Sequence, residues 1–220
     1  VMAARAAGCA MLAESSVQEV MDLSAVAHLT AIKTRVPFIN FFDGFRTSHE
    51  IQKIEIWDYE DLKPLVDMDA VKAFRKNALN PDAPVTRGTA ENPDVYFQHR
   101  EASNKFYLNV PDVVEHYMNE INKLAGTHYQ LFNYVGAPDA TDVIVTMGSS
   151  AQVVQSTVDY LNKLGRKVGF INVHLFRPFA TDRLLKALPL SVKRIAVLDR
   201  TKEPGALAVP LFLVVLAGVI

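Results

Sequence analysis

The spacing of the hydrophobic residues changes several times along this chain, and each change predicts a different element. Apolar residues at helical spacing follow Ser15 and Ser16, so we expect a largely buried helix that begins near Val17. The apolar run of residues 36–42 (VPFINFF) is continuous, which predicts an interior parallel strand. Residues 51–57 (IQKIEIW) alternate between apolar and polar, which predicts a second strand.

The flanking segments give weaker patterns. Residues 1–16 lack the basic start and long apolar core of a secretory signal, and they resemble the interior of a helical segment. Residues 59–80, 96–104 and 113–125 are expected to be helical. Three prolines and Gly88 fall within residues 81–93, so irregular structure is expected there.

A regular alternation of strands and helices begins after residue 137. Short apolar strands are predicted at 142–148, 167–176 and 194–200, with helices at 149–165 and 183–189 between them. This β-α-β-α-β order is typical of a parallel sheet with helices on its faces. We therefore expect an α/β fold with two domains, residues 1–137 and 138–220.

The last twelve residues (VPLFLVVLAGVI) are almost entirely apolar. A helix that crosses a bilayer needs about 20 apolar residues. We therefore expect a core strand followed by the start of a helix, and a membrane anchor is the alternative.

Composition narrows the function classes. Of the 220 residues, 50% are hydrophobic and 21% charged, which suffices for one large core or two modest ones. The net charge of −1 gives no reason to expect nucleic acid or a membrane as a partner. The single cysteine, Cys9, excludes a disulfide framework, and it cannot ligate an iron–sulfur cluster alone.

Charge is divided unevenly between the two halves. Residues 138–220 carry ten Lys and Arg against six Asp and Glu, which leaves residues 1–137 net acidic. Two domains that dock on each other would show such an offset, and so would two solvated faces.

Four candidate site residues follow the first predicted strand: Asp43, Arg46, Ser48 and His49. Arg46 could hold a carboxylate or phosphate, His49 could transfer a proton near neutral pH, and Ser48 could orient either partner. The structural alternative is that Asp43 and Arg46 pair to stiffen a domain junction while His49 caps the next element.

Further candidates lie in the second half. Ser149 and Ser150 open a predicted helix, where they could hold an anion or simply cap the helix, and the fingerprints of nucleotide-binding loops are missing there. Arg177 and Arg200 follow predicted strands, where they could form a domain interface or an anion site. The histidines show no spacing typical of ligands, so no metal site is expected.

Four segments resemble one enzyme family in the same order along the chain. They are VPFINFFDGFRTSHEIQKIE (36–55), RGTAENPDVYFQHRE (87–101), YVGAPDATDVIVTMGSS (134–150) and VLDRTKEPGA (197–206). The chain is thereby similar to an internal fragment of pyruvate:ferredoxin (flavodoxin) oxidoreductase. This resemblance implies that the end of a pyrimidine-binding domain for thiamine diphosphate precedes a parallel α/β domain like the transketolase C-terminal domain.

The resemblance also implies a function for the parent enzyme. Such an enzyme oxidatively decarboxylates pyruvate to acetyl-CoA and CO₂ with thiamine diphosphate and Mg²⁺. It passes electrons through iron–sulfur clusters to ferredoxin or flavodoxin, and it uses coenzyme A. The alternatives are a pyruvate:NADP oxidoreductase with a fused flavin domain, and a non-catalytic subunit or interaction module of the same fold.

The resemblance also implies which partners and which compartment the chain has. The family's catalytic residues lie outside this chain, so the chain alone should be inactive. Its partners would be the remaining domains of the parent polypeptide, a second copy in a homodimer, and the electron acceptor. The expected compartment is the cytoplasm, or a hydrogenosome or mitochondrion-related organelle in a eukaryote.

Overall fold

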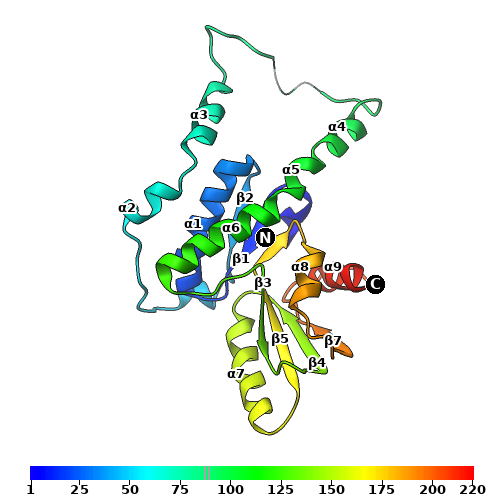
Figure 1. The fold of residues 1–220 in the computed structure, drawn as a ribbon. Coiled ribbons are helices and arrows are strands. Elements are labelled where there is room, and N and C mark those ends of the chain that lie inside the picture. Colours follow the sequence, from blue (N-terminus) through cyan, green and yellow to red (C-terminus); the bar gives the residue numbers. More distant parts are fainter. Residues whose placement is uncertain (87, 89) are drawn as a thin grey trace.

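The computed structural model describes residues 1–86, 88 and 90–220, which form an α/β fold with two sheets (Figure 1). The first sheet has the strand order β2-β1-β6, and the second has the order β3-β5-β4-β7. The strands are β1 Ala10–Ala13, β2 Phe38–Phe41, β3 Phe132–Gly136, β4 Asp142–Thr146, β5 Val168–Val173, β6 Leu175–Arg177 and β7 Arg194–Val197. The α-helices are α1 Val17–Thr34, α2 Tyr59–Leu62, α3 Met68–Lys76, α4 Tyr96–Ala102, α5 Asn104–Leu108, α6 Val110–Ala125, α7 Ser150–Lys163, α8 Thr181–Ala187 and α9 Pro210–Val219.

The first sheet differs from expectation in its centre and at its edge. The central strand is β1, which pairs in parallel with β2 and antiparallel with β6. All four residues of β1 are buried, so the expectation of a helical start was wrong for this segment. The expected strand β2 is present and parallel, but it lies at the edge and is only half-buried.

Helix α1 begins at Val17 as the sequence predicts. The Ser16 side chain accepts a hydrogen bond from the backbone N–H of Glu19, which satisfies one of the free donors of the first turn. The helix packs against β2 and α6, and buries Leu23 and Val26 in the main core.

The second sheet is parallel over three strands, since β4 pairs in parallel with both β5 and β7. The edge strand β3 is antiparallel to β5 and was not predicted. Helix α7 packs with Phe170 on one face, whereas α8 and α9 join Ile171 and Val145 in the main core on the other (Figure 1). Because successive side chains of a strand point to opposite faces, the second sheet has an apolar layer on each of its faces.

The strand predicted at 167–176 is two strands. The chain leaves the second sheet at His174, and β6 then joins the first sheet through its pairing with β1. Around this break the backbone N–H of Ala13 donates to the His174 carbonyl at 2.7 Å, and the His174 N–H donates to the Leu131 carbonyl at 3.0 Å. The two sheets are thus joined by a crossing strand.

The strand predicted at 51–57 is absent from the described structure, where residues 51–58 form an extended segment. The Gln18 side chain accepts from the backbone N–H of Glu55 at 2.8 Å and donates to its carbonyl at 3.1 Å, in place of a strand partner. Figure 1 shows the following helices projecting from the body as two arms. None of the described residues between 51 and 109 is buried, and residues 87 and 89 of the expected irregular stretch lie outside the description.

The apolar C-terminus forms the single helix α9, so the strand expected before it was wrong. Pro210 sits at the start of the helix, and the Asp199 carboxylate accepts a hydrogen bond from the Leu211 N–H at 2.9 Å. Leu211 and Val215 are buried in the main core. Among the described residues, no helix combines the length and apolar character that a bilayer crossing requires.

Candidate functional site

The polar turn after β2 divides into a half-buried part and an exposed part. Asp43 is partly buried, with 22% of its side chain exposed, whereas Arg46, Ser48 and His49 are exposed. Ser48 Oγ accepts from the Phe45 backbone N–H at 2.9 Å and lies 2.7 Å from His49 Nδ1. The His49 ring stacks on Phe45, which has the unusual φ of 69°. The four candidates therefore do not converge on one point.

Asp43 contacts the start of α7. Its Oδ2 accepts a hydrogen bond from the Ser149 backbone N–H at 2.6 Å. A helix N-terminus favours a carboxylate because free N–H groups and the helix dipole both point at it. Gly148 has φ +75°, and a Cβ there would lie 2.7 Å from Asp43 Oδ2, so only glycine lets the carboxylate approach so closely.

The expected capping of α7 by its own serines differs from the observed arrangement. The Ser149 side chain makes no capping hydrogen bond, and Ser150 Oγ lies 2.6 Å from Thr146 Oγ1 instead. The negative group at this helix start comes from Asp43, in the turn that follows β2 of the other sheet.

The partner of Asp43 is Arg200, not Arg46. Arg200 Nη1 lies 3.5 Å from Asp43 Oδ1, whereas Arg46 Nε lies 3.7 Å from Glu50. A second ion pair, between Arg5 and Glu203, links the same C-terminal loop to the start of the chain. These contacts form a junction between the two sheets.

A cavity of about 180 Å³ lies beside this junction. Asp43, Gly148 and Arg200 are among its lining residues. The other predicted site residues are not: Arg46, Ser48, His49, Ser149, Ser150 and Arg177. The junction side chains thus enclose only a small cavity.

Arg177 stands apart at the end of β6. Its guanidinium stacks over the Phe176 ring at 4.5 Å, and Nη1 donates weakly to the Phe176 carbonyl at 3.3 Å. Partial burial and the nearby charge of Arg5 lower the pKa of Arg177 from its usual range. No carboxylate lies within 4 Å of it in the described part of the chain.

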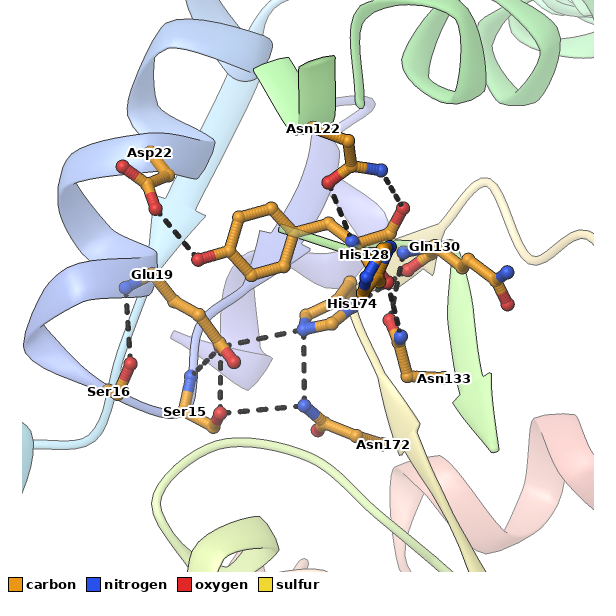
Figure 2. A network of polar contacts seen from close by, with 11 residues as sticks. Ser15, Ser16, Glu19, Asp22, Asn122, His128, Gln130, Asn133, Asn172 and His174 are labelled. Atoms are coloured by element: carbon orange, nitrogen blue, oxygen red, sulfur yellow. Dashed lines mark hydrogen bonds and ion pairs between the residues drawn. The ribbon is translucent and has the colours of Figure 1, made fainter. Parts of the chain in front are cut away.

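Sequence reasoning missed a buried polar network between α1 and the break after β5, shown in Figure 2. His174 is 1% exposed, its Nδ1 lies 2.7 Å from the Gln130 carbonyl, and its Nε2 lies 3.4 Å from Glu19 Oε2. Glu19 also accepts from the backbone N–H and the hydroxyl of Ser15, at 2.6 and 2.7 Å. Ser15, Glu19 and Gln130 all lie far from His174 in the sequence, so only the fold brings these groups together.

The charges in this network oppose the effect of burial. Burial alone would lower the pKa of His174, but the hydrogen bond and the charge of Glu19 outweigh it and raise that pKa. Burial likewise opposes ionisation of Glu19, but His174 and Ser15 hold the pKa of Glu19 below its usual range. Each member of the pair therefore favours the charged form of the other.

A third buried acid, Glu14, follows β1. It is fully buried, and its carboxyl oxygens have no hydrogen-bond partner among the described residues. Burial, and then the charge of Glu19, raise the pKa of Glu14 to about 9. Glu14 is therefore a neutral carboxylic acid at pH 7.

Metal ligands are sparse in the described residues, which hold no cluster of three or more His, Cys, Asp or Glu side chains suited to a metal ion. With one cysteine in the sequence, four thiolates for an iron–sulfur cluster cannot come from this chain. The start of α7, where the sequence predicts an anion site, already holds the carboxylate of Asp43.

Two family models match most of the chain. The thiamine diphosphate-binding domain of pyruvate flavodoxin/ferredoxin oxidoreductase matches residues 1–119, and the core domain II of pyruvate:ferredoxin oxidoreductase matches residues 140–213. The chain belongs to the pyruvate flavodoxin/ferredoxin oxidoreductase family. The resemblance carried by the four sequence segments is thereby confirmed.

Curated relatives of the oxidoreductase family share much of the sequence. The chain is 67% identical to a pyruvate-flavodoxin oxidoreductase of Enterobacter agglomerans and 62% identical to a pyruvate:ferredoxin oxidoreductase of Moorella thermoacetica, over 96% of its length in each case. It is 50% identical, over 97% of its length, to a pyruvate dehydrogenase [NADP(+)] of Cryptosporidium parvum. The chain spans 18%, 18% and 11% of these three relatives, respectively.

Proposed function

We propose that this chain is part of a longer oxidoreductase that converts pyruvate, coenzyme A and an oxidised ferredoxin or flavodoxin to acetyl-CoA, CO₂ and the reduced carrier. The 67% identity to a pyruvate-flavodoxin oxidoreductase over nearly the whole chain carries this proposal. A relative described as pyruvate dehydrogenase [NADP(+)] is 50% identical, so an NADP-linked enzyme with a fused flavin domain is the alternative.

The residues of this chain do not complete a site for the cofactors of that reaction. Thiamine diphosphate supplies a carbanion and an electron sink for decarboxylation. Mg²⁺ needs convergent oxygen ligands and iron–sulfur clusters need thiolates, and the described residues offer neither set. We infer that thiamine diphosphate, Mg²⁺, the clusters and coenzyme A are bound mainly by other parts of the polypeptide.

Our proposal for this chain is structural support of that site. Residues 1–137 would form the end of the pyrimidine-binding domain, and residues 138–220 a domain like the transketolase C-terminal domain. The family matches to 1–119 and 140–213 support this division. Asp43, Ser149 and Arg200 would hold the two parts together, while the exposed Arg46, Ser48 and His49 would face the rest of the enzyme.

Two measurements test the proposal. An antibody against this chain should detect a native polypeptide several-fold heavier than 24.4 kDa. That polypeptide, once purified, should reduce ferredoxin or flavodoxin in a reaction that depends on pyruvate and coenzyme A, whereas the 220-residue chain should not. A native species near 24 kDa would instead indicate a non-catalytic subunit, and reduction of NADP alone would indicate the flavin-fused enzyme.

The proposal also covers the oligomeric state and the compartment of the enzyme. We expect a cytoplasmic homodimer, with a hydrogenosome or mitochondrion-related organelle as the compartment in a eukaryotic source. Sedimentation of the purified native enzyme gives its subunit number, and fractionation of the source cells gives its compartment.

A further inference from the structure

A polar cavity beside α1 lies under the extended segment that follows residue 50. Its volume is about 610 Å³, within the range of small-molecule and side-chain pockets. Helix α1, the end of α6 and residues 53–58 enclose it. The lining residues are Gln18, Asp22, Lys53, Ile54, Glu55, Ile56, Trp57, Asp58, Asp61, Leu124, Ala125 and Thr127.

A buried carboxylate without a counter-ion lines this cavity. Asp22 is 1% exposed, and its Oδ1 accepts from Gln18 Nε2 at 2.9 Å. Its Oδ2 accepts from the Tyr129 hydroxyl at 2.7 Å, the interaction drawn as a dashed line to Asp22 in Figure 2. Both donors are neutral. No Lys, Arg or His nitrogen of the described chain lies within 4 Å of Asp22. An ionised carboxylate is costly to bury unless a cation compensates it.

The rim of the cavity adds negative charge. Glu55, Asp58 and Asp61 line it together with one base, Lys53. Lys53 is exposed and forms no ion pair with any described residue. The local field therefore favours a positive group and disfavours an anion.

The walls suit an apolar stem with a cationic end. Ile54, Ile56 and Leu124 contribute aliphatic surface, and Trp57 contributes an indole face, the aromatic surface that attracts cations best. The Trp57 Nε1 atom is buried and has no acceptor within the described structure. With under 1 Å² of that atom accessible, the indole ring and not its N–H would contact an occupant.

We propose that this cavity binds an organic cation, an ammonium or guanidinium group carried on a short apolar stem. The group can come from a free amine or from a lysine or arginine side chain of another protein segment. The recognition chemistry is the same in both cases: Asp22 and the rim carboxylates neutralise the charge, and the indole and aliphatic walls cover the stem.

The chain contains its own reporter for this test, because Trp57 is its single tryptophan. The fluorescence of the 220-residue chain is followed during titration with n-butylguanidinium, with N-acetyl-arginine-N-methylamide, and with 1-butanol as an uncharged control. Both cations should give a saturable change that 1-butanol does not give. Tighter binding of the arginine amide, which adds the flanking peptide groups, identifies a protein side chain as the source, and tighter binding of butylguanidinium identifies a free amine.

Two charge variants should shift the affinity for the cation in opposite directions, and a third variant is a matched control. Asp61→Asn should weaken binding about three- to five-fold, and Lys53→Gln should strengthen it to a similar degree. Asp69→Asn, at an exposed acid on α3 that pairs with Lys72 outside the cavity, should leave binding unchanged. The proposal is overturned by a lack of saturation up to the solubility of both cations, by an equal response to 1-butanol, or by Lys53→Gln and Asp61→Asn shifting binding in the same direction.

Discussion

The carboxylate of Asp43 accepts a hydrogen bond from the backbone N–H of Ser149, 106 residues further along the chain, at 2.6 Å. The contact places a negative charge at the positive end of α7, and Arg200 lies 3.5 Å away on its other side. One side chain thus links the first sheet, the start of α7 and the loop after β7.

Replacement of Asp43 by alanine should therefore loosen this junction. The variant leaves the Ser149 N–H and the helix dipole without their negative partner, so we expect the free energy of unfolding to fall by about 1–2 kcal/mol. Urea denaturation at pH 7 measures it. Glu60→Ala serves as the control, because Glu60 is exposed and forms only a surface pair with Lys63. Equal losses in the two variants would contradict a special role for Asp43.

The close approach of the Asp43 carboxylate requires a residue without a side chain at Gly148. Gly148→Ala introduces a Cβ at φ +75° and 2.7 Å from Asp43 Oδ2, so we expect a loss of about 2–3 kcal/mol. Gly165→Ala is a matched control with φ +80° and open space around the new Cβ, and it should cost only about 1 kcal/mol. In an Asp43→Ala background the excess cost at Gly148 should largely vanish, which a double-mutant cycle measures. An unchanged excess would mean that the carboxylate is not what Gly148 accommodates.

Local patterns predict the elements whose neighbours in space are also neighbours in sequence. The start of α1 at Val17 and the succession β4, α7, β5, α8, β7 follow from hydrophobic spacing and short connections. Strand β1 could not be predicted in this way, because four residues in an alanine-rich stretch carry no period, and their burial comes from β2 and β6 on either side. The end of β5 at His174 could not be predicted either. Residues 170–176 (FINVHLF) form one largely apolar run, but their hydrogen bonds are shared between two sheets.

The candidate site shows the same limit. The sequence indicates that an anion could sit at the start of the helix after Gly148, but it cannot show that this anion is Asp43, because the pairing depends on how the two sheets dock. Glu19 and His174 lie still further apart in sequence, and only the crossing of β6 to the first sheet joins them. Buried polar partners of this kind carry no periodic signal.

The Glu19–His174 pair should make stability depend on pH in a defined direction. The folded-state pKa of His174 is raised above its ordinary value of 6.5, so its contribution is present below that value and is lost as pH rises through the raised pKa. The pKa of Glu19 is lowered from 4.5, so its contribution is present above 4.5 and is lost as pH falls through the lowered value. The pair should therefore stabilise most between about pH 5 and 6.5.

The variant for this prediction is His174→Gln, which keeps a hydrogen-bonding side chain but not the charge. The groups that face His174 are Glu19 from α1, the Gln130 carbonyl, the Asn172 amide and the edge of the Tyr129 ring. The difference in unfolding free energy between the original chain and His174→Gln should shrink as pH rises from 6.5 through the raised pKa of His174. In a Glu19→Gln background this pH dependence should be much weaker, and a dependence of the same size would assign it to another group.

Glu14 should change stability with pH in the opposite sense to Glu19, whose pKa is lowered. Its folded-state pKa of about 9 lies above the ordinary value of 4.5, so the folded chain holds a proton that the unfolded chain releases between these values. Stability should fall with rising pH across that window, by at most about 1.4 kcal/mol per pH unit from this group. Glu14→Gln replaces the neutral acid by an isosteric neutral amide and removes this dependence, so the variant should gain on the original chain from pH 5 to pH 8. Urea denaturation at several pH values measures the gain, with Glu60→Gln as the exposed control, and a constant difference between Glu14→Gln and the original chain would show that Glu14 is ionised in the fold.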